Sequence, residues 1–276
     1  MTPADSADKV PPVGVDPTRP SVARMYDAAL GGKDNYEIDR AMLAQVQQAA
    51  PHVIDLARAA RAFLIRVARF LAYQTDITQF IDCGSGLPTA ENTHEVLQRV
   101  NPDARVVYID NDPVVMAHGR ALLADNEKTF LAGADVFEPQ QVLQNKEVRE
   151  HLDLSEPVGL LHISTLHYHV GAADGPAKIM REYVDALAPG SYVAIAHMHD
   201  PENEYTPMAR EVEQIMRQGV GAATFRTKAQ IEELFTGLEL LPPGVVPCVE
   251  WWPDGPQLKQ RNEVDHLMAG GVARKL

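Results

Sequence analysis

Apolar residues in the first quarter of the chain recur at the spacing of one helix face. After Ser21 they stand at Val22, Met25, Tyr26 and Ala29, the i, i+3, i+4, i+7 pattern of an amphipathic helix. Gly31 and Gly32 follow, as glycines commonly do past a helix C-terminus. Similar runs over residues 37–49 and from Pro51 to Leu71 predict two further helices. The pattern therefore predicts an N-terminal helical cap over residues 19–74.

Short apolar runs then alternate with longer helical runs. The predicted strands are 80–83, 106–109, 130–131, 158–163 and 192–196, and the predicted helices are 88–100, 113–124, 139–152, 177–187, 207–217 and 227–235. This rhythm is typical of a parallel sheet with helices on both faces. The chain ends with apolar runs at 238–241, 245–252 and 266–273 without a long helix between them, which predicts an antiparallel hairpin at a sheet edge. We expect an α/β domain over residues 75–276.

Composition adds limits to this picture. The chain has 276 residues, 45% of them hydrophobic, with a mean hydropathy of −0.20, which suits one α/β domain with a helical elaboration. Five prolines and no aromatic residue among the first twenty residues predict a flexible tail over 1–18. No apolar run is long enough to cross a membrane and no signal peptide is evident, so we expect a cytoplasmic protein with no membrane partner. Cys83 and Cys248 are too few for a disulfide framework and are expected to be buried thiols.

The charge pattern bears on the partner. The 38 acidic and 25 basic residues give a net charge of −13, which would repel a phosphate backbone, so nucleic acid is not expected as a partner. Basic residues do recur at helical spacing, at Arg58, Arg61, Arg66 and Arg69. This spacing is typical of a solvated helix face.

The first candidate site follows the strand at 80–83. Ligands of open α/β sheets bind beyond the carboxyl ends of the strands, where this chain reads Asp82-Cys83-Gly84-Ser85-Gly86. Glycines at 84 and 86 allow a tight turn and a close approach of the backbone to a ligand. A dinucleotide fingerprint would need a further glycine where Thr89 stands, which argues against NAD. Alone, the glycine pair is equally consistent with a simple strand-to-helix turn.

The next two strands end in acidic residues. Asp110, followed by Asn111, can accept the two hydroxyls of a ribose, while Asp112 before Pro113 is predicted to cap the next helix. Asp135 follows the third strand and can accept an exocyclic adenine amine, with Val136 and Phe137 packing on the ring. Three successive strand ends with suitable groups predict a nucleoside-containing ligand.

These residues resemble the class I S-adenosylmethionine-dependent methyltransferases. A closer resemblance is to an actinobacterial S-adenosyl methyltransferase family long catalogued as a domain of unknown function. The segments that carry it, within a likeness spanning about residues 17–276, are 19–27 (RPSVARMYD), 30–36 (LGGKDNY), 84–89 (GSGLPT) and 107–113 (VYIDNDP). The resemblance implies a Rossmann-like, seven-stranded, mostly parallel sheet with a reversed last strand. It also implies S-adenosyl-L-methionine as methyl donor over the first half of the sheet and the acceptor over the second. The residues that match the general methyltransferase pattern are Asp82, Gly84, Gly86, Asp110 and Asp135.

The polar loop over residues 31–36 has no counterpart in the general pattern. Its cluster of polar groups after two glycines suggests a lid over the cofactor. We expect Asp34 or Asn35 to meet the methionine end of the cofactor, and Tyr26 or Tyr36 to lie against its sulfonium. The alternative is a helix C-cap followed by a solvated turn.

Five histidines fall between residues 162 and 199, around the ends of the fourth and fifth strands. His167 and His199 are the candidates for a general base, because a neutral imidazole accepts a proton near pH 7. His162 and His197, in or beside apolar runs, are expected to be core histidines. His197 and His199 next to Asp200 would also permit a metal site, but most such clusters lack the geometry of one, so no metal is expected.

The sequence thus predicts a methyltransferase that acts on an unidentified small-molecule acceptor. A non-catalytic sensor or interaction protein that binds S-adenosylmethionine or S-adenosylhomocysteine is the main alternative. An NAD-linked oxidoreductase is a third interpretation, which the residue at position 89 disfavours.

Overall fold

The computed structural model describes residues 11, 14–87, 91–123, 125–255 and 260–276. Most of the predicted tail and the start of the helix predicted at 88–100, including Thr89, lie outside these residues. Within the tail's described part, Val15 packs against Leu87 and Val114.

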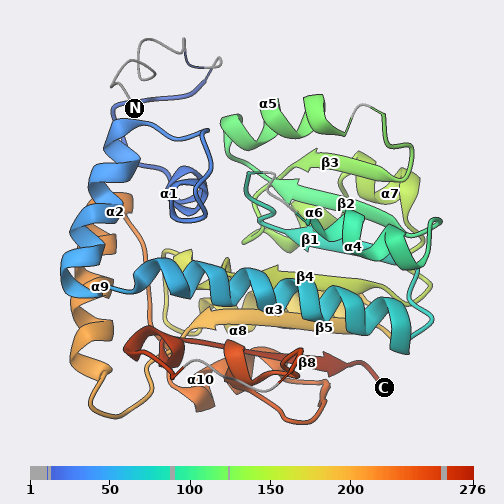
Figure 1. Ribbon diagram of the computed structural model, residues 1–276. Coiled ribbons are helices and arrows are strands. Elements are labelled where there is room, and N and C mark those ends of the chain that lie inside the picture. The colour runs from blue at the N-terminus through green and yellow to red at the C-terminus, as the bar shows by residue number, and fades with distance from the viewer. Residues whose placement is uncertain (1–10, 12–13, 88–90, 124, 256–259) are drawn as a thin grey trace.

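Three helices form the N-terminal part of the molecule (Figure 1). They are α1 (Val22–Ala29), α2 (Glu37–Ala49) and α3 (Val53–Gln74). Each agrees with a predicted helix. Helix α1 ends at Ala29, with Leu30 as its C-cap before Gly31, whose φ of 81° suits glycine. The long helix α3 buries one side from Leu56 to Leu71 against the sheet. It thereby fixes the cap to the sheet through a shared hydrophobic core.

The sheet has the order β3-β2-β1-β4-β5-β8-β6, with β7 also paired to β8. Its strands are β1 (Gln79–Cys83), β2 (Arg105–Asp110), β3 (Thr129–Gly133), β4 (Gly159–Ile163), β5 (Tyr192–Met198), β6 (Glu239–Leu240), β7 (Val246–Pro247) and β8 (Met268–Arg274). Strands β1 to β5 pair in parallel, whereas β8 runs antiparallel to β5, β6 and β7. The predicted Rossmann-like α/β fold with a reversed last strand is confirmed. Eight strands are present in the described residues rather than seven, because β6 and β7 are separate two-residue strands at the edge.

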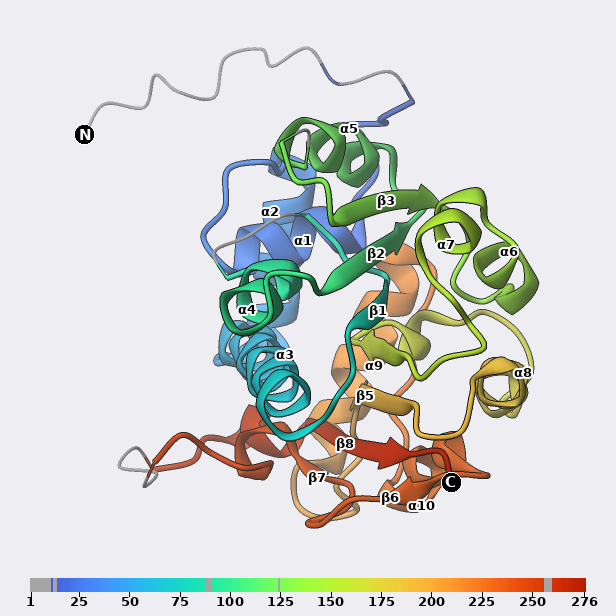
Figure 2. The ribbon, with the colours of Figure 1, turned by 90° about the vertical axis from the view of Figure 1, so that its right-hand side faces the viewer.

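Helices cover both faces of this sheet (Figure 2). The α-helices that follow the cap are α4 (Thr93–Val100), α5 (Pro113–Leu122), α6 (Pro139–Leu143), α7 (Lys146–His151), α8 (Gly175–Ala186), α9 (Thr206–Val220) and α10 (Lys228–Glu232). Short 3₁₀ helices span Leu166–Tyr168, Glu233–Phe235, Cys248–Glu250 and Glu263–His266. One core cluster joins α3 and α4 to the sheet, and a second joins α6, α7 and α8 to the other face. No helix within the described ranges is both long and apolar enough to cross a membrane.

Two predicted elements were wrong in extent. The helix predicted over 139–152 is two short helices. The first ends at Leu143, and the side chain of Asn145 accepts a hydrogen bond from the backbone N–H of Glu147 and so caps the second. The strand predicted over 245–252 is a strand only at 246–247. The chain then turns into a 3₁₀ helix, whose Cys248 carbonyl accepts a hydrogen bond from the buried guanidinium of Arg66.

Candidate functional site

A cleft of about 230 Å³ opens at the carboxyl ends of β1, β2 and β4 and is bordered by α1 and α3. We call it the strand-end cleft. It lies where the strand order turns from β2-β1 to β4-β5, the point at which open α/β sheets bind ligands. The residues predicted to contact the ligand that line it are Tyr26, Asp82, Gly84, Ser85, Gly86, Asp110, Asn111, Val136 and Phe137. Nine predicted residues from four segments of the chain therefore meet at one cleft.

The glycine loop after β1 forms the floor of the cleft. Gly84 and Gly86 have φ values of 71° and 65°, in the left-handed region that favours glycine. A Cβ added at Gly84 would lie 2.2 Å from Cγ2 of Thr165, so no larger residue fits without movement. The backbone N–H of Gly84 donates to the carbonyl of Ile109 at 2.7 Å, which ties the loop to the end of β2.

Asp110 is held in place through both of its carboxylate oxygens. Oδ2 accepts the backbone N–H of Gly86 at 2.9 Å, and Oδ1 accepts that of Asp112 at 2.9 Å. Burial raises the pKa of Asp110, while these N–H donors oppose the shift by stabilising the carboxylate. Each oxygen keeps a lone pair for a further donor, such as a hydroxyl.

Asp82 lies deeper in the cleft and is 4% exposed. Its Oδ2 accepts the hydroxyl of Thr93 at 2.7 Å. Burial raises the pKa of Asp82 to about 6, although the Thr93 hydroxyl and the charge of Arg61 act in the opposite direction. The carboxyl group therefore titrates just below neutral pH.

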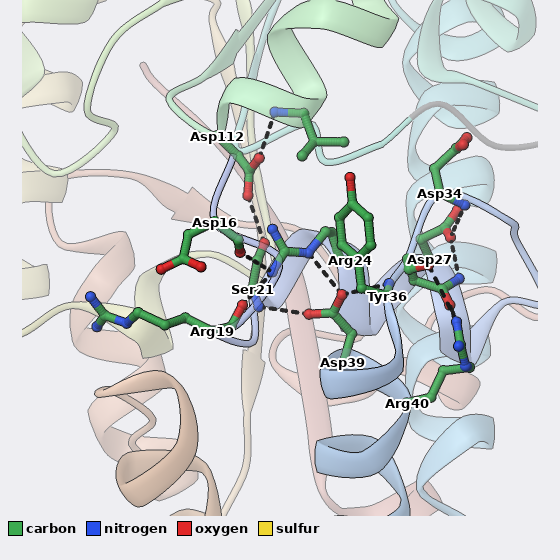
Figure 3. A network of polar contacts seen from close by, with 12 residues as sticks. Asp16, Arg19, Ser21, Arg24, Asp27, Asp34, Tyr36, Asp39, Arg40 and Asp112 are labelled. Carbon is green, nitrogen blue, oxygen red and sulfur yellow. Dashed lines mark hydrogen bonds and ion pairs between the residues drawn. The ribbon is translucent and has the colours of Figure 1, made fainter. Parts of the chain in front are cut away.

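Asp112 caps α5, as predicted, since its Oδ1 accepts the backbone N–H of Val114 at 2.8 Å. Its Oδ2 accepts the hydroxyl of Ser21 at 2.6 Å, which attaches the start of α1 to the rim of the cleft (Figure 3).

Asp135 is absent from the cleft lining, although Val136 and Phe137 border the cleft. The Asp135 carboxylate instead accepts the backbone N–H of Phe137 at 2.9 Å and shapes this turn. A role for Asp135 toward an adenine stays a prediction.

The loop over residues 31–36 makes a network of its own beside the cleft (Figure 3). Oδ2 of Asp27 accepts the backbone N–H of Asp34 at 2.9 Å and the side-chain amide of Asn35 at 2.7 Å. The Arg24 guanidinium lies over the ring of Tyr36, 5.1 Å from its centroid. The cleft lining includes none of Asp34, Asn35 and Tyr36, whereas Tyr26 does line it.

The two histidines proposed as bases lie away from the cleft lining. His167 is fully buried, and its Nδ1 accepts the backbone N–H of Met198 at 3.2 Å, so that lone pair is already used. Burial holds its pKa well below the usual range. His199 Nδ1 donates to the carbonyl of His266 at 2.7 Å, which leaves Nε2 to accept. The structure thus gives neither histidine contact with a ligand in this cleft.

His162 and His197 are fully buried, as expected of core histidines. His197 Nδ1 faces the carbonyl of Met198 at 2.7 Å, so its Nε2 accepts from the Arg226 guanidinium at 2.8 Å. In the part of the chain that the structure describes, no three His, Cys, Asp or Glu side chains are placed to hold a metal ion.

Sequence reasoning missed other residues of the cleft, including Arg61, Ser164, Thr165 and Tyr168. The solvated face predicted for the arginines of α3 was wrong at Arg66, which is buried beneath the 248–251 segment. Arg61 is partly exposed, borders the cleft and donates to the Glu91 carbonyl at 2.9 Å. Ser164 follows β4 directly, so the strand-end rule applied to the other strands would have found it. Its φ is 62°, and its buried hydroxyl has no hydrogen-bond partner among the described residues.

Comparison with known proteins gives this site a context. The chain matches a family model described as S-adenosyl methyltransferase over residues 8–276. It is 42% identical to a candidate methyltransferase of Thermobifida fusca YX, with a TM-score of 0.91 and coverage of 97% of this chain and 99% of that one. It is 35% identical to a DUF574 family protein of Streptomyces avermitilis MA-4680, with a TM-score of 0.87 and coverage of 94% and 98%.

A comparison with curated proteins found no match. The predicted family resemblance is nevertheless confirmed, because the family model covers nearly the whole sequence. The chain belongs to the S-adenosyl methyltransferase family, whose methyl donor is S-adenosyl-L-methionine.

Proposed function

We propose that this protein transfers a methyl group from S-adenosyl-L-methionine to a small-molecule acceptor, with the cofactor bound in the strand-end cleft. The observation that carries the proposal is Asp110, whose two oxygens are oriented by backbone N–H groups at the end of β2 beside the glycine loop. A carboxylate held in this way suits two vicinal hydroxyls. The net charge of −13 disfavours a nucleic-acid acceptor.

The residues present suit this cofactor. The Cβ-free backbone at Gly84 allows a close approach, and the buried Ser164 hydroxyl offers an unused hydrogen-bonding group. We assign the ribose hydroxyls to Asp110 with Asn111 nearby, the adenine to Val136, and the methionine end to Asp82 with the Gly84-Ser85-Gly86 turn. The ring of Tyr26 would face the sulfonium, an attraction of about 0.5–2 kcal/mol.

The bound cofactor supplies a methyl group on a sulfonium. S-adenosylhomocysteine would be the leaving group when the acceptor takes up this methyl group, and a proton released by the acceptor would pass to bulk solvent after the transfer. The chain's own contribution is to hold both molecules in line and to exclude water. Because His167 and His199 lie away from the cleft lining, we assign no histidine base and no metal to this step.

The same placement of the histidines favours the second candidate function, a sensor that binds the cofactor without turnover. Titration calorimetry with S-adenosylhomocysteine tests binding, and an acceptor panel read through S-adenosylhomocysteine formation tests turnover. Tight binding with no product over a broad panel would favour the sensor. Absence of binding would remove both candidates, and NADH serves as the control ligand.

Two substitutions of Ser164 distinguish the effect of its backbone strain on stability from the effect of its hydroxyl on ligand binding. Left-handed backbone costs a non-glycine residue roughly 1–3 kcal/mol, so Ser164→Gly relieves strain while losing the hydroxyl. We expect its affinity for S-adenosylhomocysteine to fall about fivefold, the equivalent of one neutral hydrogen bond. Calorimetry measures the affinity and urea unfolding measures the stability. Ser164→Ala keeps the strain and should lose the same affinity, so unchanged binding in both variants would exclude the hydroxyl from the site.

The pKa of Asp82 predicts a pH dependence of binding. With a pKa of about 6, Asp82 is ionised at pH 7.5 and protonated at pH 5, where it no longer attracts the amino group of the cofactor. We expect the affinity for S-adenosylhomocysteine to fall about tenfold per pH unit below pH 6. Other ionisable groups interact with Asp82 through their charges, so that one shifts the pKa of the other. They are Arg61, Asp110, Tyr108, Tyr26 and Cys83.

Asp82→Asn should remove this dependence in calorimetric titrations between pH 5 and 7.5. The stability of the protein should depend on pH in the opposite direction to its affinity. A folded-state pKa raised above the unfolded value of about 3.9 means that the folded protein binds the proton more tightly. The free energy of unfolding of the wild type, relative to Asp82→Asn, should therefore rise as the pH falls from about 6 to 4. Parallel pH profiles of affinity in the two proteins would contradict the assignment.

A further inference from the structure

A second cavity adjoins the strand-end cleft beneath the N-terminal helices. It is lined by α1, α2, the start of α3, α9 and the carboxyl end of β5, and α1, α2 and α9 lie together at one side of the molecule (Figure 1). We call it the apolar cavity. It shares Val22, Tyr26 and Tyr168 with the strand-end cleft, so these side chains form the wall between the two spaces.

The lining of the apolar cavity differs sharply from that of the cleft. No charged side chain is among its described lining residues, and the only side-chain polar groups are the hydroxyls of Tyr26 and Tyr168. A charged molecule entering it would lose its hydration without gaining a partner, which strongly disfavours its binding. The cavity has room for about five water molecules, since each needs roughly 10–15 Å³ of its volume of about 70 Å³.

The two tyrosines differ in what they can offer a ligand. The Tyr26 hydroxyl donates to the carbonyl of Ala57 at 3.1 Å. The Tyr168 hydroxyl has no hydrogen-bond partner among the described residues, and burial together with the nearby Tyr26 raises its pKa, so it remains a neutral phenol. Tyr168 can therefore donate to, or accept from, a polar atom placed at the junction of cavity and cleft.

We infer that the apolar cavity holds the methyl acceptor and that the acceptor is a small, uncharged and mainly apolar molecule. Its nucleophilic atom lies at the Tyr26 and Tyr168 end, facing the strand-end cleft. This inference rests on the proposed function. It adds the class of acceptor and names Tyr168 as a positioning residue that orients the nucleophile.

The walls of the cavity also suit a ligand whose shape differs from the empty space. Met25, Met198 and Met216 line it from α1, β5 and α9. Methionine side chains have three rotatable bonds and adapt to irregular partners. Protein interiors seldom leave space larger than a water molecule unfilled, so a cavity of this size beside the cofactor cleft favours a binding role over a packing defect.

Binding of neutral and charged probes tests this inference without turnover. We propose ¹⁹F NMR titrations of 4-fluorophenol and 4-fluorobenzoate with protein saturated with S-adenosylhomocysteine. 4-Fluorophenol should bind saturably and 4-fluorobenzoate should not. Ala57→Leu, which places a larger side chain at the cavity wall, should weaken the binding of 4-fluorophenol at least about tenfold. Ala72→Leu is the matched control, since it lies on the same helix outside the lining and should bind like the wild type.

A second variant tests the inference in the opposite direction. Met216→Ala enlarges the cavity and should improve the binding of the bulkier 1-naphthol about tenfold relative to 4-fluorophenol. If Ala57→Leu does not fold, Met216→Ala still tests whether the probes bind in the apolar cavity. Equal binding of 4-fluorobenzoate, no saturable binding of any neutral probe, or unchanged size selectivity in the folded cavity variants would overturn the inference.

Affinity for S-adenosylhomocysteine, measured on every variant, separates this inference from the proposed function. If the wild type binds S-adenosylhomocysteine but binds no neutral probe saturably, the acceptor cavity alone is defeated. Failure of the wild type to bind S-adenosylhomocysteine defeats the proposed function.

Discussion

Asp110→Asn is expected to weaken the binding of S-adenosylhomocysteine by at least about 100-fold, because it weakens two charge-assisted hydrogen bonds of roughly 1.5–3 kcal/mol each. The new amide also disturbs the free protein. Both oxygens of Asp110 accept backbone N–H groups, from Gly86 and Asp112, and an amide nitrogen cannot accept at either place. The substitution therefore acts on the ligand and on the glycine loop together. Calorimetric titration measures the loss of affinity.

Asp103→Asn is the matched control for this variant. Asp103 precedes the same strand, has a side chain that is 85% exposed and is paired only on the surface with Lys128 at 3.3 Å. The Asp103→Asn protein should bind S-adenosylhomocysteine as tightly as the wild type does. Near-native affinity of a folded Asp110→Asn protein would place the ribose outside the strand-end cleft and would remove the main support for the proposal.

The end of β2 was predictable because local sequence determines it. A buried strand that stops at Asp110 and a helix that begins with a capping Asp112 leave the first carboxylate at the sheet edge. The same reasoning places Asp82 and the glycine turn. The carboxyl ends of parallel strands meet at one edge, so residues far apart in sequence converge without any further information.

Residues outside the strand ends were harder to place because their surroundings come from distant segments. Arg66 follows the helical spacing of a solvated face, but residues 248–251 pack over it and accept its hydrogen bonds. His167 follows a strand end as Ser164 does, yet a 3₁₀ turn carries it into the interior, where the backbone of Met198 occupies its Nδ1. Spacing along the chain cannot show which later segment will cover a side chain.

The loop at 31–36 is held together by a residue of the preceding helix. Asp27 of α1 accepts hydrogen bonds from Asp34 and Asn35, and the role of the loop as a lid stays a prediction. One contact that joins the cap to the cleft comes from Ser21, whose hydroxyl donates to Asp112. Ser21 is in turn held by Asp39 of α2, whose Oδ1 accepts its backbone N–H at 2.9 Å. The buried Asp39 carboxylate thus helps to determine how the first helix meets the strand-end cleft (Figure 3).

Asp39→Asn is expected to lower the free energy of unfolding by about 3–5 kcal/mol, the usual cost of breaking a buried ion pair from one side. Asp39 is fully buried, and its Oδ2 accepts Nε of Arg24 at 2.8 Å and the backbone N–H of Tyr36 at 2.8 Å, so the variant leaves the buried Arg24 charge uncompensated. Urea unfolding measures the loss. Asp174→Asn, which removes an exposed ion pair with Lys178, should change the free energy of unfolding little.

The double variant Arg24→Met with Asp39→Leu should regain much of the stability, because both charges are then absent. It should still release S-adenosylhomocysteine faster than the wild type, because the backbone N–H of Ser21 has lost its acceptor. A stable Asp39→Asn protein would show instead that the network does not hold the cap to the cleft.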